Sequence, residues 1–295
     1  AVFVVGVCCW FLLKGRNVRM AKASLNVAAV TGVLATLVVM GTGDKSGVVM
    51  AQEQPMKLAA AEGLRRGGTQ APFSIVPGVE VPGVLSVLAT HDLNGYVPGI
   101  DDLLDGYTDA QGVQHLSAEQ KIARGKQALQ AFGQFRATYK SDPAAAAEAR
   151  ATLQEHLPYF GYGYLTHRSQ LEPPVWLVYW SFRLMVGIGS FLMLYLVVAL
   201  WLQRRDKLAT MRWMLWLGVA AVPMVYVAGQ AGWVVAEVGR QPWAIYELLP
   251  VQAAVSQLPV ANIMVTFFLF LLVFTLLLAA EVGIMCKAIS RHTAA

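Results

Sequence analysis

Four long apolar stretches constrain the fold of this chain more than any other feature of its sequence. An α-helix needs about 18–20 apolar residues to cross the roughly 30 Å hydrocarbon core of a bilayer. Only 14% of the 295 residues are charged, whereas 56% are hydrophobic. The sequence therefore predicts an all-α integral membrane protein with four complete transmembrane helices, at 24–41, 174–202, 213–238 and 259–286.

A fifth apolar stretch, at 1–13, is too short to cross a membrane. It starts without Met, has no basic region before it and has no small-residue cleavage site after it, which argues against a signal peptide. We interpret it as the end of a truncated helix, and we expect the chain to be the C-terminal part of a longer protein. Cys8, Cys9 and Cys286 form no metal or disulfide pattern, and we expect small side chains that face the core or the lipid.

Basic residues cluster after three of the apolar stretches and predict the topology. Cytoplasmic loops of membrane proteins carry an excess of Lys and Arg. Segments 42–173 and 239–258 are then extracytoplasmic, and the net charge of +5 belongs to the inner membrane face, with no indication of nucleic-acid binding. The clusters are Lys14, Arg16, Arg19 and Lys22; Arg204, Arg205, Lys207 and Arg212; and Lys287 and Arg291.

These spans divide the chain into three predicted parts. Residues 1–41 hold the short helix and the first complete span, 42–173 form a large outer loop, and 174–295 hold three further spans. A loop of that length between two spans usually has a function.

Local signals predict several elements inside the loop. Residues 55–66 have the composition of a short helix, whereas 72–90 are too rich in Pro and Gly to be one. Ser117 precedes a helix at 118–139, and Asp142 with Pro143 precedes another that ends near 157.

One stripe near the end of the third complete span carries chemistry. Trp233, Glu237 and Arg240 or Gln241 fall on one helix face, just before Pro242. An ionised carboxylate facing lipid costs several kcal/mol, so Glu237 should point toward a cation, a proton path or a metal. The alternative is a Glu237–Arg240 pair that only ties down the helix end.

Four other residues have functional and structural interpretations. Arg183 lies inside a span, where it needs an acid or the propionates of a cofactor as a partner. For Met185, the local sequence alone indicates an ordinary apolar core residue. Lys57 and Glu62, five positions apart, read locally as solvated side chains of a short helix. The chain contains no P-loop, GxGxxG, HExxH or GxSxG motif, so soluble nucleotide or hydrolase chemistry is not indicated.

Taken together, several motifs resemble subunit I of the cytochrome bd-type quinol oxidases, in the branch with a long Q-loop. They occur in the family's order and cover the chain except the middle of the outer loop. GRQPW is the most specific of them. The motifs are GRNVRMAK, GDKSG, KLAAAE, SFRLM and GWVVAEVGRQPWAI.

The resemblance implies roles for the candidate residues. Segment 42–173 would be the Q-loop, with Lys57 and Glu62 in quinol binding and oxidation. Met185 would be an axial ligand of a low-spin b-type haem, and Glu237 a ligand of a high-spin b-type haem. Two side chains would contact haem propionates, namely Arg183 and Arg240, while Trp233 would lie on the electron path.

The resemblance also implies an activity and its partners. Quinol, either ubiquinol or menaquinol, would be oxidised at the outer face of a bacterial cytoplasmic membrane, and electrons would pass through haems to reduce O2 to water without proton pumping. The cofactors would be two haems b and a haem d or third haem b. Partners would be oxidase subunit II, a small single-helix subunit and membrane lipid.

Two alternatives remain open at this point. One is a transporter or channel in which Glu237 and Arg183 line a path through the membrane. The other is a non-catalytic truncated remnant. None of the five His residues lies in a complete span, so a His ligand of a haem within the membrane would have to come from outside this chain.

Overall fold

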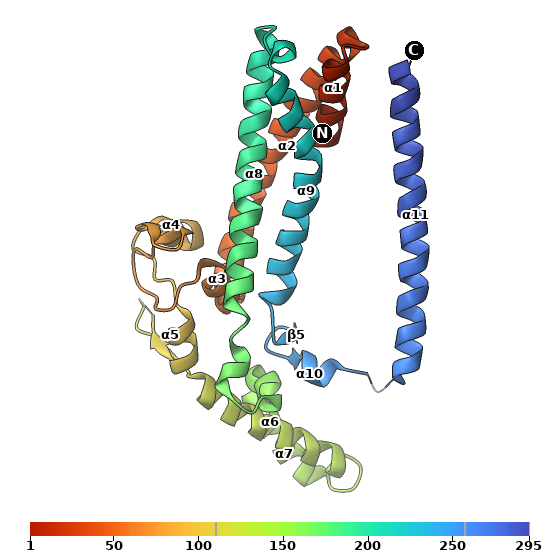
Figure 1. Cartoon of the computed structure of the whole chain (residues 1–295). Helices are drawn as coiled ribbons and strands as arrows, with labels where there is room; N and C mark the ends of the chain where they lie inside the picture. Colours follow the sequence, from red (N-terminus) through yellow and green to blue (C-terminus); the bar gives the residue numbers. More distant parts are fainter. Residues whose placement is uncertain (110, 257, 295) are drawn as a thin grey trace. The chain divides into compact units, whose positions relative to one another are not determined.

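The computed structural model describes residues 1–109, 111–256 and 258–294. Within these residues, four helices are long and apolar enough to cross a membrane, which confirms the prediction of an all-α multi-pass membrane protein (Figure 1). The short apolar stretch at the N-terminus forms helix α1, Val2–Lys14. The four long helices are α2 (Val18–Glu53), α8 (Val175–Arg204), α9 (Arg212–Val238) and α11 (Val260–Ala294).

Helix α2 is longer than the predicted span, which was expected to end at residue 41. The helix continues through the glycine-containing segment GTGDKSG and ends at Glu53. Glycine weakens a helix by about 1 kcal/mol without breaking it. Proline does break one, and the chain reaches Pro55 just beyond the end of α2. The segment predicted as a loop after this span therefore begins as a helical extension of α2.

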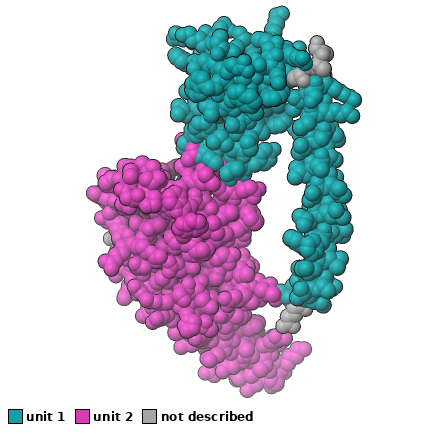
Figure 2. All heavy atoms as spheres, viewed as in Figure 1, with its two compact units in different colours: residues 1–38, 188–227, 256–295 teal, residues 39–187, 228–255 magenta. Residues whose placement is uncertain are grey.

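The chain divides into two compact units (Figure 2). The first comprises residues 1–38, 188–227 and 256–295, and the second comprises 39–187 and 228–255. Helices α2, α8 and α9 each contribute one part to each unit. All seven residues for which the sequence predicts a role lie in the second unit.

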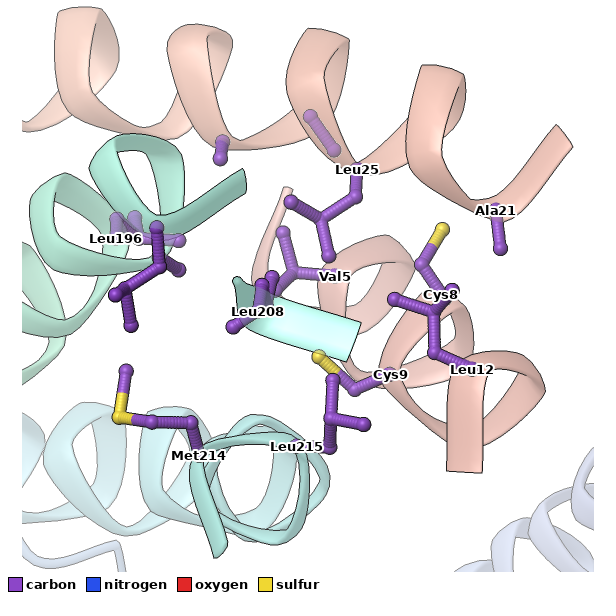
Figure 3. Close-up of a cluster of buried hydrophobic side chains, with 14 of the residues drawn as sticks. Val5, Cys8, Cys9, Leu12, Ala21, Leu25, Leu196, Leu208, Met214 and Leu215 are labelled. Atoms are coloured by element: carbon purple, nitrogen blue, oxygen red, sulfur yellow. The ribbon is translucent and has the colours of Figure 1, made fainter. Parts of the chain in front are cut away.

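The first unit has its own apolar core, in which α1 packs against parts of α2, α8 and α9 (Figure 3). Val5, Leu25 and Leu215 are completely buried there. Cys8 and Cys9 belong to the same cluster, as expected for small apolar side chains, whereas Cys286 is exposed. Full burial of a Val or Leu side chain contributes roughly 1.5–3 kcal/mol.

The second unit is built mainly from short elements, and three of its hairpins are two-stranded antiparallel sheets. The short helix predicted at 55–66 is present as α3, Pro55–Glu62. The other elements of the unit are β1 (Phe73–Val76), β2 (Val79–Val81), α4 (Val84–Thr90), α5 (Ile100–Asp105), β3 (Tyr107–Thr108), β4 (Gln114–His115), α6 (Ala118–Thr138), α7 (Pro143–His156), η1 (Leu157–Tyr164), η2 (Arg168–Leu171), β5 (Trp243–Ile245), β6 (Leu249–Pro250) and α10 (Val251–Ala254).

The two longer helices of the loop begin where the sequence predicts. The Ser117 hydroxyl accepts a hydrogen bond from the Gln120 N–H, and the Gln120 side chain accepts one from the Ser117 N–H. Asp142 caps α7 by accepting from the backbone of residues 144 and 145. Such caps contribute about 1 kcal/mol each.

The prediction for residues 72–90 is wrong in its second half. The first half is the β1–β2 hairpin, but α4 follows it directly. Gly83 has a φ of 77° and turns the chain into the helix, and no Pro or Gly lies between there and Thr90. Leu85 and Ala89, four positions apart, are buried in one cluster with Leu58. The helix is therefore stabilised by packing that the Pro- and Gly-rich composition does not reveal.

Candidate functional site

Helix α3 carries Lys57 and Glu62 on different sides. Pro55 occupies its first turn, where a missing N–H costs nothing, and Gly63 ends it with a φ of 66°. At 100° per residue, five positions separate two side chains by roughly 140° around the helix. Residues 58–61 between them are buried. The two charged side chains therefore lie in different surroundings.

Glu62 forms a buried ion pair with Arg183 of α8. The Arg183 Nη2 donates to the Glu62 Oε2 over 2.6 Å, and the two side chains are 8% and 2% exposed. The Ser74 backbone N–H of β1 also donates to Glu62. Burial raises the pKa of Glu62 above its ordinary value, although the Arg183 charge opposes this rise. The prediction from spacing that Glu62 is a solvated surface residue is wrong.

Arg183 has donor capacity beyond this pair. Its guanidinium lies about 5 Å from three aromatic rings, those of Phe73, Tyr179 and Phe182. The Nε and Nη1 atoms of Arg183 are buried and make no hydrogen bond to any described residue. Buried donors without a partner cost free energy and call for an acceptor, and a carboxylate of a cofactor is suitable.

Met185 lies two positions beyond Arg183 and faces helix α9. Its Sδ would be 2.9 Å from a Cβ atom placed on Gly232, so the glycine leaves the room that the thioether occupies. Met185 is half-buried. Trp233, the next residue on α9, is 63% exposed. The thioether therefore lies against α9.

The end of helix α9 brings Glu237, Arg240 and Lys57 together. Arg240 Nη2 donates a hydrogen bond to Glu237 Oε2, and the Gln241 side-chain amide donates to the Glu237 carbonyl over 3.4 Å. The Lys57 Cγ would be 3.0 Å from a Cβ on Gly239, which places the lysine against this turn. The pairing of Glu237 with Arg240, left open by the sequence, is the arrangement that the structure has.

The charge balance of this cluster affects Lys57. Burial lowers the pKa of Lys57, and the positive charge of Arg240 lowers it further, while Glu237 opposes both. Half-buried beside a cation, the Lys57 ammonium is a readier proton donor than an ordinary lysine. The structure thus joins Lys57 to Glu237 and Arg240, and it joins Glu62 to Arg183.

A small cavity of about 50 Å³ lies beside Lys57 and Arg240. Glu62 is not among the residues that line it. A carboxylate is nevertheless present, because Glu247 follows strand β5 and lies on the wall of the cavity. The Tyr162 hydroxyl donates to the Glu247 Oε1 over 2.6 Å. The lining also includes Lys121, Gln241, Trp243 and Tyr246.

Comparison with known protein families gives the decisive finding. The family model of the cytochrome bd terminal oxidase subunit I matches residues 1–293. The chain belongs to this family. The predicted resemblance is therefore confirmed over nearly the whole sequence.

Curated relatives of this cytochrome bd subunit I chain agree. The cytochrome bd-II ubiquinol oxidase subunit 1 of Escherichia coli strain K12 is 33% identical, with 97% of this chain and 58% of the relative covered. The cytochrome bd ubiquinol oxidase subunit 1 of Bacillus subtilis strain 168 is 28% identical, with 87% and 46% covered. The chain spans about half the length of the curated relatives it matches.

The fold agrees with a solved structure of the same kind. The bd oxidase from Geobacillus thermodenitrificans superposes with a TM-score of 0.64 and 23% sequence identity, over 98% of this chain and 54% of that chain. At that identity the likeness supports the fold alone.

Three residues of this cytochrome bd subunit I chain matter to the site and escape the sequence reasoning. Ser74 and Tyr162 sit in the outer loop without a motif around them, and they reach Glu62 and Glu247 only through the fold. Glu247 did leave a signal. It is an acid in an apolar run directly after GRQPWAIY.

Proposed function

We propose that this chain is part of subunit I of a terminal quinol oxidase, which oxidises quinol at the outer membrane face and passes electrons through haems to O2, giving water. Besides family membership, one observation carries this proposal: Lys57, Glu237 and Arg240 converge at one end of α9. In addition Arg183, two positions before Met185 on α8, has buried donors that make no hydrogen bond within the described residues. The residues proposed to bind quinol and haem all belong to one compact unit.

For quinol, Lys57 is the proposed contact to a quinol oxygen. Its lowered pKa favours an ammonium that donates a strong hydrogen bond and can give up a proton. Burial raises the pKa of Glu62, which suits a carboxyl group that takes up a proton during quinol oxidation. Relatives are named as ubiquinol oxidases and, in one Bacillus subtilis protein, as a putative menaquinol oxidase, so the proposed donor is one of these two quinols.

The residues around Met185 fit a b-type haem. The Met185 thioether is the proposed axial ligand, and the unpartnered Nε and Nη1 of Arg183 suit its propionates. Glu237 is the proposed ligand of a second b-type haem, with Arg240 as a propionate contact and Trp233 on the electron path. The third haem, d or b, has no assigned residue in this chain. A bound haem would supply reversible one-electron transfer.

Other residues of the chain hold the proposed haem-binding side chains in position. Gly232 leaves the Met185 sulfur its position against α9, and Glu62 holds the Arg183 guanidinium by one edge while other donors stay free. Arg240 pairs with the Glu237 carboxylate at the end of α9, which offsets its charge.

The proposed topology gives the reaction an electrical consequence. The basic clusters place the Q-loop, residues 42–173, on the outer side of a bacterial cytoplasmic membrane. Quinol protons are then released outside while protons for water are taken from inside, which separates charge without a pump. Oxidase subunit II and a small single-helix subunit are the proposed protein partners.

The test is a dithionite-reduced minus air-oxidised absorption spectrum of the assembled oxidase that contains this chain, together with quinol-dependent oxygen consumption. The proposal predicts b-type bands, a further band from the third haem, and oxygen uptake that depends on quinol. Absence of haem bands would contradict it and would favour the transporter reading of Glu237 and Arg183.

A further inference from the structure

A second cavity adjoins the small one beside Lys57 and is much larger, at about 410 Å³. Both cavities are lined by Pro55, Leu103, Lys121, Tyr246 and Glu247. The larger cavity continues to His115 and to the exposed Glu53. Glu247 therefore stands between the surroundings of Lys57 and an open cavity of the outer loop.

The position of Glu247 is fixed by the 3-10 helix η1. Tyr162 donates to the carboxylate over 2.6 Å, and the Gly161 N–H donates to the Glu247 backbone carbonyl over 3.1 Å. Glu247 itself has a φ of 56°, in the tight turn between β5 and β6. These constraints present the carboxylate to both cavities and hold it there.

The phenols around Glu247 are not proton acceptors. Burial raises the pKa of Tyr162 and of Tyr246, and the neighbouring Glu247 charge raises both further. Both hydroxyls therefore stay protonated at neutral pH, and that of Tyr162 donates to Glu247. The Lys121 ammonium lies 5.4 Å from the centre of the Tyr162 ring and is a cation already. Glu247 is the group among them that can accept a proton.

The size of the inner cavity limits what passes through it. About 50 Å³ holds one or two water molecules, whereas ligand pockets usually measure several hundred Å³. A quinol ring does not fit there, but a water-mediated proton transfer does. Glu62, the carboxyl group of α3, is held in the buried pair with Arg183 and does not line this cavity.

We infer that Glu247 accepts the proton lost on the Lys57 side and releases it through the larger cavity to the outer solution. The inference rests on the proposed quinol oxidation. A quinol O–H bond breaks, and the proton passes by way of water to the Glu247 carboxylate, where a carboxyl O–H bond forms. The electrons leave to the haem acceptor of the oxidase. The carboxyl group then loses its proton to water in the larger cavity, which restores Glu247.

Besides Glu247, several charged or titratable groups line the two cavities. They come from α3, α6, η1, the turn before and within β5–β6, the end of α2, β3 and β4. These groups are Lys57, Lys121, Tyr159, Tyr162, Arg240, Tyr246, Glu53, Tyr107 and His115.

The test compares two electron donors in the assembled oxidase. For Glu247→Gln, the inference predicts that kcat with quinol falls by about 100-fold, within the usual range for loss of a proton acceptor. Oxygen uptake with tetramethyl-p-phenylenediamine, a donor that gives electrons without protons, should stay at the wild-type rate. Glu247→Asp should restore part of the quinol activity. Glu148→Gln, on exposed α7, is the matched control and should change neither activity.

A second variant tests the hydrogen bond. Tyr162→Phe keeps the carboxylate but removes its donor, so the acid limb of the kcat–pH profile with quinol should move to higher pH. Wild-type kcat and pH profile in both variants would overturn the inference, as would an equal loss with both donors in Glu247→Gln. A wild-type oxidase that fails to oxidise quinol at all would instead overturn the proposed function.

Discussion

Helix α3 carries a charged side chain near each end, and the two side chains lie in different surroundings. At its C-terminal end, Glu62 is nearly completely buried and paired with Arg183. At its N-terminal end, Lys57 lies half-buried at a water-sized cavity, among Arg240 and other charged groups. A motif such as KLAAAE therefore does not describe one site. Its two charged residues lie in different surroundings, Glu62 in a buried ion pair with Arg183 and Lys57 beside a water-sized cavity.

A mutation in the Glu62–Arg183 pair, at the C-terminal end of α3, should have the largest effect on stability. Arg183→Ala leaves the Glu62 carboxylate buried without its partner, which costs about 3–5 kcal/mol. Arg65→Ala removes the exposed pair with Glu172 and should cost less than about 1 kcal/mol. Thermal unfolding of both variants in detergent measures the difference. Equal small losses would mean that the buried pair does not hold α3 to α8.

A mutation of Lys57, near the N-terminal end of α3, should lower turnover and leave stability nearly unchanged. Lys57→Met removes a charge-assisted hydrogen bond to quinol, worth about 1.5–3 kcal/mol, so kcat/KM for quinol should fall roughly 10- to 100-fold. Haem content should not change. Lys126→Met, on the exposed side of α6, is the control. A normal kcat/KM in Lys57→Met would separate Lys57 from quinol oxidation.

The neighbourhood of Met185 allows a subtler test. Gly232→Ala places a Cβ about 2.9 Å from the Met185 Sδ and forces the thioether to move. Gly229→Ala meets nothing within 4 Å and should gain about 0.5–1 kcal/mol from helix propensity alone. The expected difference in stability between the two is about 1 kcal/mol. Only Gly232→Ala should shift the midpoint potential of the low-spin haem; identical potentials would contradict the proposed ligand.

The smallest effects concern pH, and the two ends of α3 should respond in opposite windows. Burial raises the pKa of Glu62 above 4.5, so the folded state binds more protons and stability falls as pH rises through that window. Burial lowers the pKa of Lys57 below 10.5, so the folded state binds fewer protons and stability rises toward that pH. In a plot of Tm against pH, Glu62→Gln should reduce the pH dependence in the acid range, and Lys57→Met should reduce it in the alkaline range. If both variants changed the same pH range, the two ends of α3 would not lie in separate surroundings.

Local patterns predicted much of the fold. Apolar length predicted four spans, and Ser117 and Asp142 predicted the starts of α6 and α7. The extension of α2 to Glu53 and the helix α4 were missed, because glycine weakens a helix without deciding its end and because packing stabilised α4. Composition indicates the local helix propensity of a segment, whereas tertiary packing can stabilise a helix in a segment of low propensity.

The candidate site was predictable only in part. Glu237 and Arg240 are three positions apart, so their pairing could be considered from spacing alone. Glu62 and Arg183 are 121 positions apart, and Tyr162 and Glu247 are 85 apart. Contacts at such separations depend on how the helices and loops pack, which one sequence does not reveal.

One measurement tests the central claim, that this chain holds a haem at Met185 of a quinol oxidase. It is the reduced-minus-oxidised spectrum of the assembled oxidase with Met185→Leu, beside Met193→Leu on the same helix. The account predicts loss of the low-spin b band in the first variant and a wild-type spectrum in the second. A low-spin band that persists unchanged in Met185→Leu would contradict it.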